Sequence, residues 1–451
     1  MWAGNVVQEG QSFSIPASRL NVSELDRQSL SAGLRLKGEL SENITLEANF
    51  SAFDILEDED RSSTTNPQAV GFTPAGQIAD YEDTGWRTAE LKLVYDIPGL
   101  DGARLATGAR FERYEMNFNI YNSDNFRAGT KRGLSNRSGG ETSLSALFAQ
   151  LHWELNPHWH LALGGRYEAW KSRNGYYSND DAATPAFELE QVPGTEKEKF
   201  SPKFSLGYQF TGDWRLDYSL AKAYRFPIVE ELFSQYRAYN SISEANPELQ
   251  PEDGLHHNLM LERTLDQGYI RLNVFQENID DVIESQSTIL PGGVSIRTFI
   301  PVDEVETRGV ELIANAHDAL VENLDIRFNL AYTDAKVARN APDPSLEGNA
   351  YPRMPKWRAN LLATYRPTER WTLGGNVQYT SNSFGRLDNT DDASNVYGAQ
   401  DSYTRIGLKT TYQLNERISL GAGIDNLTDA MDYVAHPWPG RTFYTHISYD
   451  L

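Results

Sequence analysis

Residues 324–332 read Leu-Asp-Ile-Arg-Phe-Asn-Leu-Ala-Tyr, with an apolar residue at every second position. Residues 357–365 repeat the pattern as Trp-Arg-Ala-Asn-Leu-Leu-Ala-Thr-Tyr. A period of two is the pattern of a β-strand that has one apolar and one polar face. Tyr332, Trp357 and Tyr365 stand at the ends of these runs, where strands that cross a membrane place amphipathic rings. The two segments therefore predict membrane-spanning strands.

The same alternation recurs from about Ser29 to the last residue, in about seventeen segments of roughly ten residues each, the length that a tilted strand needs to cross a bilayer. Short turns alternate with long polar loops. The predicted long loops cover residues 56–83, 117–139, 171–198, 225–252, 281–303, 335–355, 382–400 and 427–440. Outer-membrane barrels have short turns on one side and long loops on the other. The pattern therefore predicts an all-β protein, a transmembrane antiparallel β-barrel.

The composition alone would suggest a different class of protein. The chain has 451 residues, a net charge of -22 and a mean hydropathy of -0.54, and it has no apolar run long enough for a membrane-spanning helix. A barrel strand, however, needs an apolar residue only at every second position. The acidic balance argues against nucleic acid as a partner. Because cysteine is absent, a disulfide framework and thiolate metal sites are excluded.

The strand count predicts that part of the barrel is missing from residues 1–451. Bacterial single-chain barrels have even strand numbers, and the large plugged transporters have about twenty-two strands. About seventeen strands would therefore need about five more. Residues 1–5, Met-Trp-Ala-Gly-Asn, lack the basic and apolar regions of a signal peptide. We therefore expect one N-terminally truncated barrel over residues 1–451.

Several short motifs occur in an informative order. Residues 221–227 read Ala-Lys-Ala-Tyr-Arg-Phe-Pro, and residues 246–252 read Asn-Pro-Glu-Leu-Gln-Pro-Glu. Residues 306–312 read Glu-Thr-Arg-Gly-Val-Glu-Leu. Near the end, residues 425–429 read Asp-Asn-Leu-Thr-Asp and residues 439–443 read Pro-Gly-Arg-Thr-Phe. In this order and spacing, the C-terminal two thirds of the chain resembles the TonB-dependent receptors.

The resemblance implies a barrel in the bacterial cell outer membrane that captures a scarce nutrient, most often a ferric siderophore, with cobalamin, haem and oligosaccharides as other cargoes. It implies an iron chelate or a similar small molecule as ligand, with outer-membrane lipid and lipopolysaccharide as surroundings. It implies no cofactor. The chain departs from the family in ending on Leu451 rather than on an aromatic residue. It also departs in showing no plug domain and no TonB-box segment, through which such receptors reach TonB.

Two groups of basic and aromatic residues in the predicted loops are candidate ligand sites, because an anionic chelate could be held there by charge and stacking. The first group is Tyr121, Phe126, Arg127, Lys131, Arg132 and Arg137. The second group is Tyr236, Arg237 and Tyr239. The alternative for both groups is a solvated loop whose cations pair with neighbouring carboxylates or with lipopolysaccharide phosphates.

Other candidate sites are weaker. The acidic runs 57–60 and 388–392 carry oxygen ligands, but neither has the spacing of an EF-hand. His256 and His257 are adjacent in a predicted strand, so their rings should point to opposite faces. His436 lies in the last predicted loop, where contact with haem is the less favoured interpretation. No metal site is predicted.

Other classes of function have less support in the sequence. The chain shows no Gly-x-Ser-x-Gly elbow, no His-Glu-x-x-His and no phosphate loop, so we expect no enzyme. A passive outer-membrane channel and a non-functional receptor fragment remain as alternatives. A soluble β-propeller would show a repeat of blade length, which the chain lacks.

Overall fold

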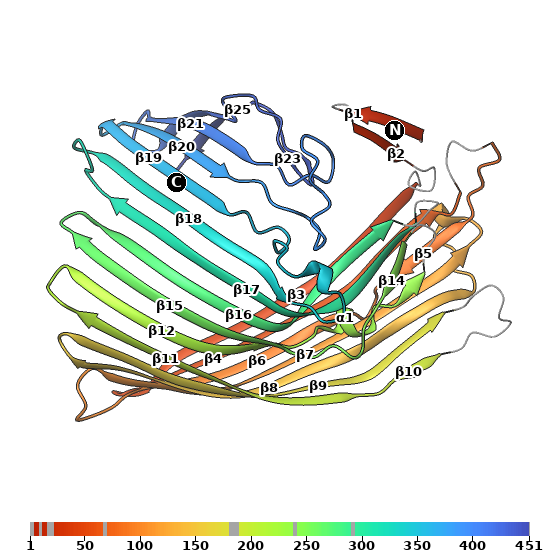
Figure 1. The fold of residues 1–451 in the computed structure, drawn as a ribbon, viewed down its shortest axis with the longest axis horizontal. Helices are drawn as coiled ribbons and strands as arrows, with labels where there is room; N and C mark the ends of the chain where they lie inside the picture. Colours follow the sequence, from red (N-terminus) through yellow and green to blue (C-terminus); the bar gives the residue numbers. More distant parts are fainter. Residues whose placement is uncertain are drawn as a thin grey trace.

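The computed structural model describes residues 4–8, 11–15, 22–65, 70–179, 189–237, 241–289 and 294–450. Within these ranges the chain is almost entirely β-sheet, as Figure 1 shows. The predicted all-β antiparallel barrel fold is confirmed. Among the described residues, no helix combines the length and the apolar character needed to span a membrane.

Seventeen strands of eight or more residues, counted over the described ranges, form one sheet. They are β3 (Ser23–Ser41), β4 (Ile44–Ser63), β6 (Gly85–Asp96), β7 (Ala103–Ser123), β8 (Leu134–Asn156), β9 (Trp159–Asn179), β11 (Thr195–Gln209), β12 (Trp214–Arg225), β15 (Glu252–Leu265), β16 (Gly268–Ile289), β17 (Ser295–Ala316), β18 (Leu324–Arg339), β19 (Trp357–Thr368), β20 (Trp371–Thr380), β21 (Tyr403–Gln413), β22 (Ile418–Asp425) and β25 (Thr442–Tyr449). Each pairs antiparallel with the next long strand along the chain.

Shorter elements lie at the ends of these strands or apart from them. The short strands β5 (Gly76–Asp80), β10 (Glu190–Val192), β13 (Tyr236–Arg237) and β14 (Ser241–Glu244) extend the sheet on the side of the long loops. β1 (Gly4–Gln8) with β2 (Gln11–Ile15), and β23 (Tyr433–Val434) with β24 (His436–Pro437), form separate hairpins. The helical turns are η2 (Phe126–Ala128), α1 (Val229–Phe233) and η3 (Pro344–Leu346).

The strand order places β25 next to β3, as in a closed barrel, but among the described residues no register pair joins these two strands. Among the described residues, every register partner of β3 lies in β4, and every register partner of β25 lies in β22. The two strands lie apart in Figure 1. Their side chains are unusually open: Leu34 is 59% exposed and Ile447 is 75% exposed, against 38% for Leu361 in the middle of the sheet. With seventeen antiparallel strands, β3 and β25 also run in the same direction. We call the gap between them the seam.

The sheet has two faces of different chemistry. One row of register partners crosses six strands as Tyr218, Leu259, Val274, Val310, Tyr332 and Trp357. All members of this row are apolar or aromatic, and we call their side the outer face. The opposite, inner face carries cross-strand ion pairs such as Lys92 with Glu47, at 3.2 Å. The alternation predicted from the sequence therefore separates the two faces of a barrel wall.

The predicted long loops are shorter than expected, because the strands continue into them. β4 extends to Ser63 and β7 to Ser123, and β8 already begins at Leu134. In the extensions of β4 and β8 both faces are largely polar, so the apolar period that marked the strands is lost there. Cross-strand ion pairs accompany the pairing instead, as between Arg27 and Asp58 at 2.8 Å.

The two faces predict opposite responses to a new charge. Leu361 lies on the outer face near the middle of β19, and Asn360 lies beside it on the inner face. If the outer face meets lipid, Leu361→Arg should cost about 2–4 kcal/mol of unfolding free energy, and Asn360→Arg should cost much less. Urea unfolding in lipid vesicles measures both values, and equal costs would contradict this assignment of the faces.

Candidate functional site

The segment between β12 and β15, residues 226–251, folds inward; we call it the inner loop, and its residues 238–240 are not described. At one end its helix α1 lies against β7, β8 and β9. At the other end its strand β14 pairs with β17 in parallel. Four long strands separate β9 from β17 in the sheet order. The inner loop therefore bridges two distant parts of the wall, on the side of the long loops.

The local sequence explains why α1 begins where it does. Pro227 precedes the helix, and the Glu231 carboxylate accepts a hydrogen bond from the backbone N–H of Ile228 at 2.9 Å. This contact satisfies one of the donors that the first turn of a helix leaves free. Glu230 and Glu231 also place negative charge at the positive end of the helix.

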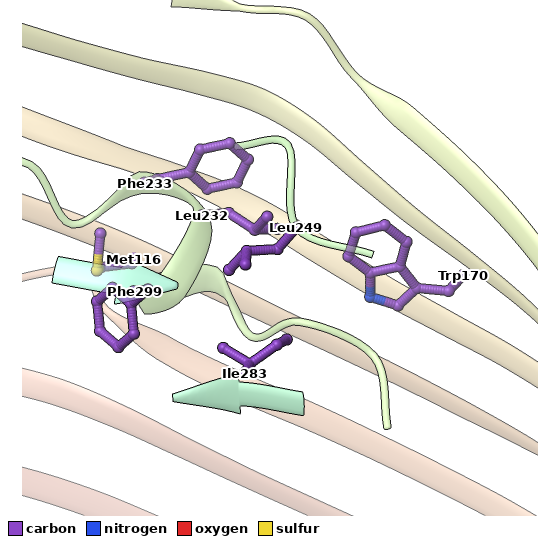
Figure 2. Close-up of a cluster of buried hydrophobic side chains, with 7 residues drawn as sticks. All are labelled: Met116, Trp170, Leu232, Phe233, Leu249, Ile283 and Phe299. Carbon is purple, nitrogen blue, oxygen red and sulfur yellow. The ribbon is translucent and has the colours of Figure 1, made fainter. Parts of the chain in front are cut away.

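An apolar cluster fastens α1 to the wall, as Figure 2 shows. Leu232 and Phe233 of the helix are 2% and 1% exposed. The remaining members are Met116, Trp170, Leu249, Ile283 and Phe299, which come from β7, β9, the inner loop, β16 and β17. Burying a side chain of this kind stabilises the packed state by about 1.5–3 kcal/mol, so the cluster holds the helix firmly.

Two glycines make room for the Phe233 ring. A Cβ atom at Gly140 of β8 or Gly175 of β9 would lie 2.4 Å or less from a carbon of that ring. No ordinary side chain fits in this space, so both positions require a residue without a Cβ. We call Gly140 and Gly175 the glycine seat.

Ion pairs fix the start of the inner loop. The Arg225 guanidinium donates to Glu231 at 3.1 Å and to Glu252 at 2.9 Å. Glu252 also accepts the backbone N–H of Ile283 at 2.9 Å. Phe226 stacks on Trp170, with ring centroids 5.8 Å apart. The motifs at residues 221–227 and 246–252 thus hold the inner loop against the wall, a role that sequence reasoning did not assign.

Tyr236 of the second predicted group lies in an aromatic row. Its ring lies edge-on to that of Phe118, with ring centroids 5.0 Å apart, and the centroids of Phe118 and Tyr81 are 4.3 Å apart. Burial raises the pKa of the Tyr236 phenol, so the group stays neutral over the physiological range. Sequence reasoning missed Tyr81 and Phe118. Phe118 lies at a point that was predicted to be a loop, although Asn117–Ile120 retains the strand alternation.

Two cations lie beside this aromatic row. Arg297 occupies the register row of Tyr236, through Ser243 of β14. It donates to Glu230 at 3.1 Å, and its guanidinium carbon lies 4.8 Å from the centre of the Phe299 ring. Arg237 is exposed, and no ion pair involves it within the described part of the chain. Tyr239, the third member of the predicted group, lies outside the described residues.

The first predicted group does not form one site. Lys131 is enclosed by Asp80 and Glu59 and lies 5.2 Å from the centre of the Tyr121 ring. Partial burial opposes its charge, but hydrogen bonds to Asp80 and Glu59 outweigh that effect and raise the pKa of the Lys131 ammonium. Phe126 is fully buried, so it offers no stacking surface.

The other cations of that group are distributed over different surfaces. Arg132 pairs with Asp124 at 2.8 Å, and Arg127 is exposed next to Phe126. Arg137 lies in β8, an even number of residues from Leu147, which is exposed on the outer face. Arg137 therefore points outward, with its guanidinium carbon 4.8 Å from the centre of the Tyr176 ring.

The weaker candidates also have definite places. His256 contacts Glu277 at 3.3 Å, and His257 contacts the Tyr218 hydroxyl at 2.9 Å. Since Glu277 and Tyr218 lie on opposite faces of the sheet, the prediction that these two rings diverge is confirmed. His436 contacts the Tyr397 ring edge-on.

Carboxylates of the two acidic runs form ion pairs with neighbouring basic side chains. Asp58 and Glu59 of the first run pair with Arg27, Arg61 and Lys131. Asp388 of the second run pairs with Arg386. In the described ranges, no group of three His, Asp or Glu side chains is arranged to hold a metal ion.

Comparisons of this chain with known proteins all point to one family. The family model described as TonB dependent receptor-like, beta-barrel, matches residues 5–427. The ferric enterobactin receptor of Pseudomonas aeruginosa is 23% identical over 442 residues, which cover 86% of this chain and 54% of that receptor. The vitamin B12 transporter BtuB of Photobacterium profundum is 25% identical over 260 residues, which cover 55% of this chain and 37% of the transporter. The chain thus spans about half or less of these relatives.

Solved structures share the fold. The copper transporter OprC superposes with a TM-score of 0.73 at 19% identity, covering 96% of this chain and 67% of that one. The ferric citrate transporter FecA in the unliganded form gives a TM-score of 0.70 at 15% identity, covering 93% and 61%. At these identities the likeness concerns the barrel architecture.

The glycine seat predicts how the inner loop responds to truncation of its anchor. Phe233→Ala should weaken the packing of α1 by about 3–5 kcal/mol, because it leaves a cavity over Gly140 and Gly175. Hydrogen exchange of residues 229–233 should accelerate accordingly. Phe443→Ala, at a side chain that is 70% exposed, is the control. Unchanged exchange in the Phe233 variant would show that the loop is held elsewhere.

Proposed function

The chain belongs to the TonB-dependent receptor family, and from that membership we propose that it forms the wall of an outer-membrane receptor that takes up a scarce nutrient. We propose that the nutrient is a ferric siderophore. The observation that carries the proposal is the inner loop, which places Tyr236 in one register row with Arg297 of β17, and Arg237 next to Tyr236, on the side of the long loops.

Electrostatics supports an anionic ligand at this place. The chain has a net charge of -22, so exposed cations beside aromatic rings stand out from their surroundings. Arg237 has no ion pair among the described residues, and Arg297 has one, with Glu230. An iron chelate that carries negative charge and flat rings would gain both charge attraction and cation–π or stacking contact there. Cobalamin offers less negative charge to these cations.

Not every predicted residue is retained in the proposed site. Tyr236 and Arg237 form its centre, and Arg127 is kept as an exposed second contact. Lys131 is neutralised by two carboxylates, and Arg137 points outward, so neither is assigned to the ligand.

The proposed site predicts a charge-dependent affinity. Arg237→Gln combined with Arg297→Gln should weaken binding of a ferric catecholate chelate about tenfold, because two charge-assisted contacts are lost. Fluorescence quenching on titration of the protein in detergent measures the affinity. Arg308→Gln, at a 60% exposed cation on the outer face of β17, is the matched control. Saturable binding of cobalamin but not of the chelate would contradict the ferric siderophore as nutrient and favour cobalamin. A steady open conductance with no saturable binding would favour a passive channel.

We further propose that additional strands fill the seam. In lipid, unpaired backbone N–H and C=O groups cost several kcal/mol each. Among the described residues, β3 and β25 each have one edge without a register partner at the seam. An odd number of further antiparallel strands would satisfy both edges and give the even total of bacterial barrels.

The intact mass of the protein purified from the outer membrane checks this proposal. We expect either a polypeptide heavier than the 50.8 kDa of residues 1–451 or a second chain that stays bound to it. A single chain of 50.8 kDa in a folded, membrane-inserted protein would contradict the proposal, since the seam would then have to close by itself.

A further inference from the structure

The inner face of the sheet has a hollow on the side of the short turns, far from the inner loop. It has a volume of about 470 Å³ and crosses β16, β17, β18, β19 and β20, and this size is that of a small-molecule site. Asn315, in the hollow, and Arg297, in the proposed ligand site, lie near opposite ends of β17, about 60 Å apart along the strand. We call this place the lumen hollow.

Amide side chains form the surface of the lumen hollow. Asn360 of β19 lies on the inner face, and its register partners are Asn329 of β18 and Gln378 of β20. Asn315 of β17 and Asn376 of β20 line the hollow in the next row toward the short turns. An amide offers both N–H donors and a carbonyl acceptor. The lumen hollow can therefore bind hydroxyl and carbonyl oxygens without adding charge.

Some of this hydrogen-bonding capacity is unused. Asn315 Oδ1 is buried without a hydrogen-bond donor among the groups that the structure describes, and a buried acceptor without a donor is costly. The Asn329 amide donates to Glu311 at 2.9 Å, which leaves its carbonyl oxygen for another partner. A ligand that brings hydroxyl groups into the hollow would supply the missing donors.

The charge of the lumen hollow is positive. Arg327 is the one charged side chain among the described residues that line it, it is exposed, and it forms no ion pair with any group that the structure describes. Asp325, two residues away on the same strand, is already held by Arg366 at 2.7 Å and by His317 at 3.0 Å. In a chain with a net charge of -22, this free guanidinium favours an anion.

We propose that the lumen hollow is a second ligand site, which binds an anionic, oxygen-rich chelate near the periplasmic end of the barrel. A carboxylate of the ligand pairs with Arg327, which can donate two parallel hydrogen bonds to it. Its hydroxyl and carbonyl oxygens contact Asn360 and Gln378. Because most of the surface is neutral, the site holds the ligand loosely enough for release, as passage requires. The inference rests on the uptake function proposed above and adds a place that the ligand occupies after the inner loop.

The test counts sites by isothermal titration calorimetry of the protein purified from the outer membrane, with ferric citrate as the probe. We expect a saturable site that persists when Arg237 and Arg297 are both replaced by Gln. Arg327→Gln combined with Asn360→Leu should weaken that site about tenfold, because the charge-assisted pair and one amide contact are lost.

A steric variant and a charge control accompany this measurement. Asn376→Trp, which fills the hollow and keeps Arg327, should weaken the site as well. Arg35→Gln is the matched control. Arg35 alternates on β3 with Leu34 and Leu36, whose side chains are exposed on the outer face, so it is also a cation of the inner face but lies outside the hollow. The Arg35 variant should bind ferric citrate as the wild type does.

The outcomes separate this inference from the proposed ligand site. Absence of any saturable site in the Arg237 and Arg297 variant would overturn the lumen hollow as a site and leave the inner loop as the binding place. Unchanged affinity in the Arg327 and Asn360 variant would overturn it too, as would an equal loss in the Arg35 variant. Conversely, binding that depends on Arg327, in a protein whose inner loop binds no chelate, would reject the inner loop site and support the lumen hollow.

Discussion

The pairing of backbone groups in a medium without water is the constraint on which the rest of this structure depends. Within lipid, every N–H and C=O must find its partner inside the protein. Each long strand between β4 and β22 meets this condition through antiparallel neighbours on both sides. Side chains are then free to alternate, apolar outward and polar inward. The seam between β3 and β25 is the one place in the described sheet where the long strands leave this condition unmet.

The wall in turn determines where a ligand can be held. A barrel of this width leaves space that its own side chains do not fill, so selectivity must come from segments that fold inward. The inner loop is such a segment. Its position depends on Phe233 in the glycine seat and on Arg225 between two carboxylates. Removing Arg225 would leave two largely buried carboxylates, Glu231 and Glu252, without this partner. The loop therefore has a defined place rather than a range of positions.

The sequence was sufficient for the wall and insufficient for the site. Strands such as 324–332 could be predicted because one face is apolar and the other polar, which makes the period of two visible. Above that region both faces are largely polar in β4 and β8, so these extensions were predicted as loops. The alternation of Asn117–Ile120 in β7 was missed. Arg137 was placed in a ligand group because its segment was predicted as a loop. Had β8 been predicted as far as Leu134, the alternation from Leu147 would have placed Arg137 on the outer face. Tyr236 and Arg237 were predicted together, but their neighbours Phe118 and Arg297 come from distant strands. Only the register brings them together.

The glycine seat divides the inner loop into two parts with different evolutionary freedom. The anchor around Phe233 admits few substitutions, because both the ring and the two glycines beneath it must be kept together. The β13–β14 hairpin beyond it is less restricted, since β14 joins β17 through backbone pairing, although Tyr236 packs on Phe118 and Ser243 is buried. A lineage could therefore exchange exposed residues of the hairpin, and with them the proposed ligand contacts, while the barrel that carries the loop stays as it is.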